Sequence, residues 1–200
     1  MTAVAPRTTN EVLARHLDGS LAAIGGLRDK LPMVVAWAEL LHRRLAGGHR
    51  LLVAGNGGSA ALAQHLTSEL VGRFDGERRP FSALCLSAET SSLTAIGNDY
   101  GFADTFARQV QAHGRPGDVL LTLSTSGRSA NLVHAAAEAQ RLDLVVWAMT
   151  GELPNPLGAR ADDVLEVAAS SAAAVQEAQQ VLVHLLCRAF DLACRAEVSA

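Results

Sequence analysis

The sequence predicts an α/β fold in which helices cover both faces of a parallel β-sheet. Short apolar runs alternate with longer helical patterns from Arg50 onward, and this alternation is typical of βαβ units. Hydrophobic residues make up 49% of the 200-residue chain, which is enough to build a sizeable core. No linker, repeat or low-complexity stretch interrupts residues 50–195, so we expect one continuous domain there.

The strands and helices of this domain are expected from the spacing of the apolar residues. Five short apolar runs are the predicted strands, and they cover residues 51–54, 83–86, 119–123, 144–149 and 164–167. Helical patterns follow most of these runs and cover residues 60–71, 102–112, 131–140 and 173–195.

Two amphipathic helices are expected before the first strand. The first has one apolar stripe, formed by Val12, Leu13, Leu17, Leu21 and Ile24. The second begins after Pro32, and its stripe consists of Met33, Val34, Trp37, Leu40, Leu41 and Leu45. Two helices cannot enclose a core alone, so they pack on the rest of the domain or on another subunit. We therefore divide the chain into an N-terminal helical segment, residues 1–48, and an α/β domain, residues 49–200, which together form one structural unit.

The composition argues against several classes of protein. A net charge of −3 and the lack of any Lys/Arg block argue against a nucleic-acid-binding protein. No apolar run approaches the roughly 20 residues that cross a membrane, and the N-terminus does not resemble a signal peptide. Cys85, Cys187 and Cys194 have neither metal-type nor disulfide-type spacing, and their odd number suits a reducing cytosol. We therefore expect a cytoplasmic protein that binds neither nucleic acid nor membranes.

The first predicted strand ends in a small-residue loop that suits an anion. Residues 55–59, Gly-Asn-Gly-Gly-Ser, lead directly into a helix, where backbone N–H groups and the helix dipole attract negative charge. The loop is neither a P-loop nor a dinucleotide fingerprint, because it lacks the lysine and the glycine spacing of those motifs. The alternative interpretation is a tight strand–helix turn capped by Ser59.

Hydroxyl side chains cluster after the third predicted strand, where another helix begins. Together with the N–H groups of that helix they would form a neutral cradle for a phosphomonoester, and their number exceeds what one helix cap needs. The alternative is a hydroxyl-rich capped turn. The hydroxyl residues are Ser124, Thr125, Ser126 and Ser129. After the second strand, Asn98 and Asp99 would either fix sugar hydroxyls or simply form a turn.

Candidate acid–base or metal-binding groups lie on two of the predicted helices. His65 and Glu69 are four residues apart, so both lie on one helix face, either sharing a function or forming a plain surface pair. His184 lies in an apolar run of the last helix and is either functional or a core histidine. Gln176 precedes it by two helical turns, roughly 12 Å along the axis. Both would reach one ion only if their side chains converge or a neighbouring subunit contributes.

This ordered series of motifs resembles the sugar isomerase (SIS) domain family and, within it, the phosphoheptose isomerases. The likeness extends over nearly the whole chain, and its most specific part is the order in which the motifs follow one another. The resemblance implies a flavodoxin-like five-stranded parallel sheet with helices on both faces, preceded by two N-terminal helices. It also implies a homotetramer built partly through those helices, with active sites at subunit contacts.

The resemblance also implies roles for single residues. One Zn²⁺ per subunit would be held by residues matching the family's ligands, namely His65, Glu69, Gln176 and His184. Glu69 and His184 would be the catalytic pair, and Arg73 stands where the family has an arginine near the end of the helix. Besides Arg73, the substrate-binding positions, some of them shared with the metal site, match Asn56, Gly57, Gly58, Ser59, His65, Glu69, Asn98, Asp99, Ser124, Thr125, Ser126, Ser129 and Gln176.

The implied reaction is the isomerisation of sedoheptulose 7-phosphate to D-glycero-D-manno-heptose 7-phosphate through an enediol. Three alternatives remain open from the sequence. The first is a non-catalytic SIS module that binds a sugar phosphate or a protein, as the replication-initiator-associated members do. The second is a SIS transcription regulator, for which the chain has no room for a DNA-binding domain. The third is an isomerase of another sugar phosphate, because residues 60–64, Ala173 and residues 71–75 depart from the usual family pattern.

Overall fold

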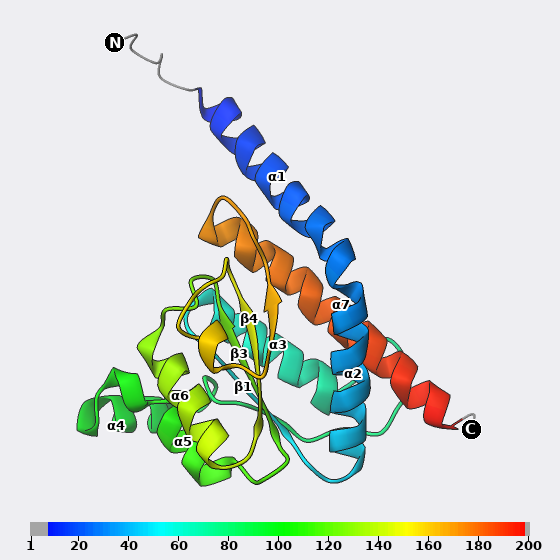
Figure 1. Ribbon diagram of the computed structural model, residues 1–200, viewed down its shortest axis with the longest axis vertical. Coiled ribbons are helices and arrows are strands. Elements are labelled where there is room, and N and C mark those ends of the chain that lie inside the picture. Colours follow the sequence, from blue (N-terminus) through cyan, green and yellow to red (C-terminus); the bar gives the residue numbers. More distant parts are fainter. Residues whose placement is uncertain (1–7, 199–200) are drawn as a thin grey trace.

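Five parallel strands form the centre of the molecule, in the order β2-β1-β3-β4-β5 (Figure 1). The structure is a computed structural model, and it describes residues 8–198. The order is that of the flavodoxin-like doubly wound sheets. It confirms the predicted fold class and all five predicted strands. The strands are β1 (Leu51–Gly55), β2 (Ala83–Cys85), β3 (Val119–Ser124), β4 (Val145–Thr150) and β5 (Asp163–Glu166).

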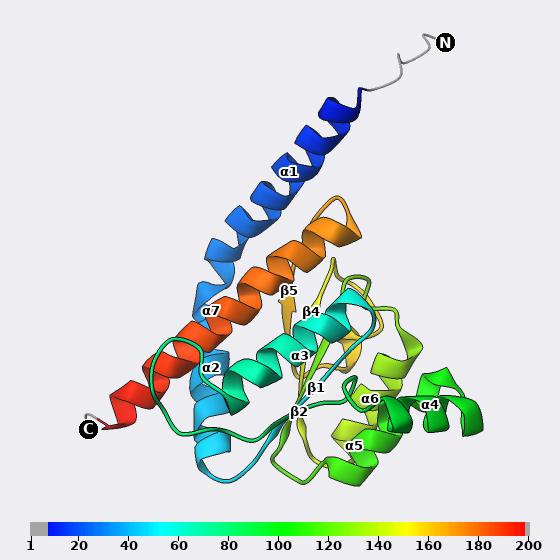
Figure 2. The same ribbon diagram turned by 180° about the vertical axis from the view of Figure 1, so that it is seen from behind.

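Alternate residues of each strand face two separate cores. Leu51 and Val53 of β1 belong to one core, whereas Leu52 and Ala54 belong to the other, as the two-residue period of a strand requires. Helices therefore cover both faces, as predicted, and Figures 1 and 2 show the two layers. The first layer contains α2 (Leu31–Ala46), α3 (Gly58–Val71) and α7 (Ala172–Val198), and the second contains α5 (Ala107–His113) and α6 (Ala130–Arg141).

The two N-terminal helices follow one another with only a short turn between them. α1 (Thr9–Gly25) begins with a capping box, in which Thr8 and Glu11 each accept a hydrogen bond from the other's backbone N–H. The 3₁₀ turn η1 (Gly26–Lys30) joins α1 to α2, whose first turn contains Pro32, a favoured place for proline. α1 reaches beyond the sheet and packs along α7 (Figure 1).

The two predicted apolar stripes have different surroundings. The stripe of α2 is part of the core, where Trp37 stacks on Trp147 of β4 with ring centroids 4.4 Å apart. The stripe of α1 is largely uncovered in a single chain, since Leu13 is 61% exposed and Leu17 is 59% exposed. The division of the chain at residue 48 stays a prediction, and residues 1–7 of that segment lie outside the described residues.

The segment between β2 and β3 differs from the prediction. The sequence pattern did not indicate α4 (Thr90–Asp99), which has no buried residue and contains hydroxyl-bearing, β-branched and glycine residues that are weak helix formers. Glu89 starts this helix by accepting hydrogen bonds from the backbone N–H groups of Ser91 and Ser92. The predicted helix at residues 102–112 is divided into a 3₁₀ turn, η2 (Phe102–Asp104), and α5.

The order of the strands determines where a ligand would bind. The chain leaves β1 and β3 towards opposite faces of the sheet, so a crevice is expected between the loops that follow these two neighbouring strands. Both small-residue loops singled out in the sequence lie at this switch point. Within residues 8–198, no helix combines the length and the apolar character needed to cross a bilayer.

Candidate functional site

The loop after β1 brings the N-terminal end of α3 to the switch point. Gly57 has a φ of +54°, a conformation that glycine adopts without strain, and it precedes the first residue of α3. A Cβ atom on Gly55 would lie 2.5 Å from the carbonyl oxygen of Ser59, so the loop packs closely on the first turn of the helix. Ser59 is buried and does not cap α3, which rules out the alternative of a serine-capped turn. The exposed start of the helix is suited to an anion.

Two of the four hydroxyl groups in the loop after β3 accept hydrogen bonds from the backbone of the loop itself. The Ser124 hydroxyl accepts a hydrogen bond from the backbone N–H of Gly127 at 3.0 Å, and the Ser126 hydroxyl accepts one from Arg128 at 3.3 Å. Ser129 is the residue before α6, but its side chain makes no capping bond. Thr125 is half-buried beside it. The capped-turn alternative therefore accounts for only two of the four hydroxyl groups, and the other two remain available to a ligand.

A pair of asparagines ties the two loops together across the switch point. The side-chain amides of Asn56 and Asn131 exchange two hydrogen bonds, each 2.9 Å long. Asn131 lies in the first turn of α6 and is only 2% exposed. The sequence analysis did not select Asn131, although an asparagine next to the hydroxyl-rich loop and on the apolar side of α6 was an available signal. Its contact fixes the orientation of the Asn56 amide at the crevice.

Three of the predicted catalytic or metal-binding residues come together between α3 and α7. The Nε2 atoms of His65 and His184 lie 2.9 Å apart, and Oε1 of Glu69 lies 3.6 Å from Nε2 of His65. The His184 side chain is exposed, so it is not the core histidine of the alternative interpretation. The spacing of His65 and Glu69 thus reflects more than a surface pair, because the third residue comes from a distant helix.

Two glutamines extend this cluster along α7. Nε2 of Gln180 lies 3.0 Å from Nε2 of His184, one helical turn away, and the sequence analysis gave Gln180 no role. Gln176 lies a further turn along, against the loop after β1: a Cβ atom on Gly58 would lie 1.8 Å from its Nε2 atom. Gln176 therefore connects the loop with the cluster, and Gly58 leaves room for its side chain.

The donor set of this cluster fits a zinc ion in chemical type. Zinc in proteins is bound by imidazole nitrogen and carboxylate oxygen, which His65, His184 and Glu69 supply. Nε2 of His184 has one lone pair at most, yet two nitrogen atoms lie within hydrogen-bonding distance of it. Among residues 8–198, however, no group of three or more His, Cys, Asp or Glu side chains is placed so that it could hold a metal ion.

Side chains from neighbouring segments pack around the cluster. The Phe74 ring lies against the His184 imidazole with centroids 5.7 Å apart, a contact that the sequence did not indicate. Cys187, one turn beyond His184, is 2% exposed. Burial first, and the negative charge of Glu69 second, raise the pKa of the Cys187 thiol from 9.0 to about 12. The Cys187 thiol beside the cluster is therefore uncharged at neutral pH.

The remaining predicted substrate-binding residues lie apart from this cluster in a single chain. Asn98 and Asp99 are exposed at the end of α4, where the Asn98 amide donates to Asp99 Oδ1 at 2.8 Å. α4 packs through Leu93 on the core of the α5–α6 layer, on the opposite face of the sheet from α7 (Figures 1 and 2). Arg73 is 61% exposed and pairs with Glu77. Their roles in binding stay predictions.

Comparisons with known proteins agree on one family. A sequence model of the SIS domain matches residues 29–151. The phosphoheptose isomerase of Streptomyces coelicolor is 54% identical over 186 residues, which are 93% of this chain and 80% of that protein. The structure of a phosphoheptose isomerase from Francisella tularensis superposes with a TM-score of 0.85 at 35% identity, covering 93% of this chain and all of that one. The phosphoheptose isomerase of Neisseria gonorrhoeae gives 0.84 at 39% identity, covering 92% of this chain and 99% of that one.

Proposed function

The chain belongs to the phosphoheptose isomerases of the SIS domain family, and we propose that it interconverts sedoheptulose 7-phosphate and D-glycero-D-manno-heptose 7-phosphate. The single observation that supports this reaction best is the meeting of His65, Glu69 and His184 beside two loops suited to a phosphate. A module that only binds a sugar phosphate needs the loops but has no use for this group of acid–base side chains. The non-catalytic alternative is therefore not favoured.

The reaction requires a base and an acid on either side of two adjacent carbons. A proton leaves C1 of the ketose, an enediol forms, and a proton is added at C2, while a hydroxyl proton moves between the two oxygens. Glu69 is the proposed base that holds and returns the carbon-bound proton, and His184 is the proposed acid that serves the oxygens. Their side chains come from different helices, and each of them lies close to His65. A substrate lying over this group would meet both.

One zinc ion per subunit is proposed at the same cluster, held by His65, Glu69, Gln176 and His184. When bound, zinc supplies a Lewis acid that polarises the carbonyl oxygen of the sugar. The proposal is supported by the donor types and by the close approach of the Nε2 atoms of His65 and His184, which lie 2.9 Å apart. The two roles proposed for Glu69, metal ligand and base, oppose each other, because a carboxylate that binds a metal is a weaker base. A change of role as the substrate binds would reconcile them.

The two loops are proposed to hold the phosphate and the sugar chain. The positive N-terminal ends of α3 and α6 and the hydroxyl groups of Thr125 and Ser129 are proposed to contact phosphate oxygens. Asn56 is held in position by Asn131 and would contact the sugar. The other members of the proposed binding set are Gly57, Gly58, Ser59, Arg73, Asn98, Asp99, Ser124, Ser126 and Gln176.

We propose a homotetramer in which neighbouring subunits complete each site. The exposed stripe of α1, with Leu13 and Leu17 uncovered, is a surface that a second copy would bury. In one chain, α4, which ends in Asn98 and Asp99, packs on the opposite face of the sheet from α7, so a neighbour's α4 is the proposed source of these contacts. A cytoplasmic location is proposed because no disulfide joins the described cysteines, all of which lie within residues 8–198.

Incubation with sedoheptulose 7-phosphate tests the proposed reaction. Nuclear magnetic resonance (NMR) follows the aldose directly, since the anomeric carbon of the product, C1, carries a hydrogen, whereas the anomeric carbon of the ketose, C2, carries none. Isothermal titration with the same sugar measures binding separately. Binding without any conversion would favour the non-catalytic alternative over the isomerase.

A further inference from the structure

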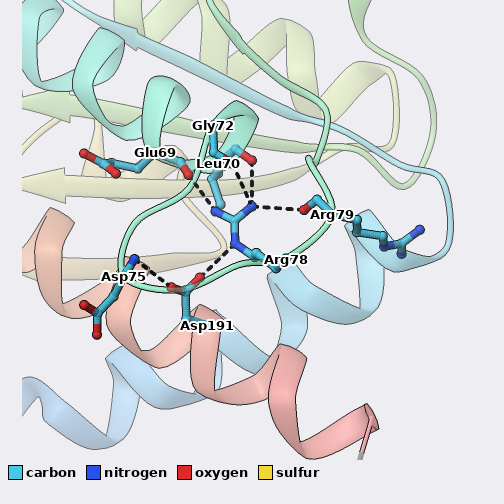
Figure 3. Close-up of polar contacts among 7 residues, drawn as sticks. All are labelled: Glu69, Leu70, Gly72, Asp75, Arg78, Arg79 and Asp191. Carbon is cyan, nitrogen blue, oxygen red and sulfur yellow. Dashed lines mark hydrogen bonds and ion pairs between the residues drawn. The ribbon is translucent and has the colours of Figure 1, made fainter.

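Arg78 is a buried arginine in the segment that follows α3. Its side chain is 8% exposed, and Asp191 of α7, which pairs with it, is 5% exposed. The Arg78 Nε donates to Oδ1 of Asp191 at 2.8 Å, and the guanidinium carbon lies 5.5 and 5.6 Å from the ring centroids of Phe81 and Phe190. Figure 3 shows that the guanidinium points towards the carbonyl groups of Glu69 and Leu70 at the end of α3.

Arg78 supplies hydrogen bonds to the end of α3, together with the backbone N–H of Phe81, which also donates to the Leu70 carbonyl at 3.1 Å. The last carbonyl groups of a helix have no partner within the helix, and α3 has no basic residue in its own last turn. Arg78, which lies in the segment that follows α3, supplies both hydrogen-bond donors for these carbonyl groups and a positive charge. Its terminal nitrogens donate to the carbonyl oxygen of Glu69 at 2.6 Å and to that of Leu70 at 3.0 Å. A cation at this place also opposes the negative end of the helix dipole.

The same arginine joins the two helices that carry the acid–base group. Glu69, whose carbonyl Arg78 holds, is on α3, whereas Asp191 lies two helical turns after His184 on α7. Asp191 also accepts a hydrogen bond from the backbone N–H of Asp75, at 3.2 Å. The Arg78–Asp191 pair therefore fixes the end of α3, the following segment and α7 with respect to one another (Figure 3).

We infer that Arg78 is a positioning residue, which sets the distance between Glu69 and His184 through its bonds to the Glu69 carbonyl and to Asp191. Arg78 does not touch the substrate. The inference rests on the proposed function, because it assigns Arg78 to the geometry of that reaction. A rigid arginine is required, since its planar fork reaches several acceptors at fixed angles, whereas lysine offers one flexible ammonium.

The test compares Arg78→Lys with Arg79→Lys, a matched control next to it in the chain. Arg79 is exposed, and its side chain lies over Phe81 without contacting the carbonyl groups of α3. We expect Arg78→Lys to lower kcat per folded molecule ~10-fold or more, with KM within about twofold, because a small displacement of reacting groups slows chemistry more than binding. Arg79→Lys should match the wild type. Hydrogen exchange should become faster at the backbone amides of residues 68–73 only in Arg78→Lys.

The outcomes separate this inference from the proposed function. Wild-type kcat and wild-type exchange in Arg78→Lys would overturn the positioning role, as would a loss of activity that merely follows the unfolded fraction in a thermal melt. If Arg78→Lys does not fold, Asp191→Asn replaces it, because that variant keeps the shape of the pair and removes its charge; the same fall in kcat is expected. A wild-type protein that binds but does not convert the sugar overturns the proposed function. In that case, hydrogen exchange at residues 68–73 alone supports or overturns the role of Arg78 in holding the end of α3.

Discussion

The imidazole groups of His65 and His184 face one another with their Nε2 atoms 2.9 Å apart, although 119 positions separate them in the chain. One histidine comes from α3, immediately after the first loop, and the other from the exposed side of α7. The contact places Glu69 in the same cluster. This relationship between two helices is the basis of the proposed chemistry.

Replacing Glu69 tests its role as the base. Glu69→Gln keeps the size of the side chain but removes its ability to accept a proton. We expect kcat to fall by at least ~100-fold, the usual contribution of a general base, while the sugar phosphate still binds. Steady-state kinetics and calorimetry measure the two effects. Near-normal turnover would exclude Glu69 as the base.

Removing an imidazole tests the proposed metal. We expect about one zinc per wild-type chain by elemental analysis, and a loss of at least ~10-fold in zinc affinity in His65→Ala, because losing a direct ligand exceeds the effect of losing an outer one. His134→Ala is the matched control, since His134 lies on α6 and pairs with Asp104 at 2.9 Å. Equal zinc in His65→Ala and wild type would contradict the assignment, and chelation of the wild type should abolish turnover.

The asparagine pair makes a prediction about phosphate binding. Asn131→Ala leaves the Asn56 amide without its partner and should destabilise the fold by about 1–3 kcal/mol, the cost of losing a buried hydrogen-bonding partner. Asn131→Asp should raise KM more than Asn131→Ala, because its negative charge would lie next to the phosphate. Gln140→Ala, an exposed change on the same helix, is the control. A lower KM in Asn131→Asp than in Asn131→Ala would contradict the position of the phosphate.

The thiol next to the cluster makes a prediction about pH. Burial raises the pKa of Cys187 to about 12, so about one molecule in ten thousand is a thiolate at pH 8. Because the folded pKa exceeds the unfolded value of 9.0, this thiol stabilises the fold fully below pH 9 and loses that contribution as the pH rises towards 12. Mass spectrometry after iodoacetamide at pH 8 should show Cys187 unmodified when folded and modified in urea. Rapid modification of the folded protein would contradict the burial.

The strands could be predicted because their apolar runs reflect burial on both faces of the sheet. α4 could not, since its residues neither form an apolar stripe nor favour a helix, and Glu89 instead holds its first turn. The start of the predicted helix at residues 102–112 was wrong for a related reason. There the chain forms a 3₁₀ turn before α5, which spacing alone does not reveal.

The site could be predicted in its parts but not in its assembly. Periodicity placed His65 and Glu69 on one face, yet nothing in the spacing of residues predicts that His184 would meet them, because that contact depends on how α7 packs on α3. Asn131 and Gln180 were overlooked for the same reason. Each acts through a partner that only the packing of helices against the sheet brings close.

The most direct test of the account is the conversion of sedoheptulose 7-phosphate in D₂O by the zinc-loaded protein, with Glu69→Gln in parallel. NMR should show the aldose C1 signal growing with time in the wild type and deuterium entering C2 of the product, because the proton added at C2 passes through an exchangeable carboxyl group. Glu69→Gln should give neither signal on the same time scale. A wild-type protein that binds the sugar phosphate and yields no aldose would contradict the account.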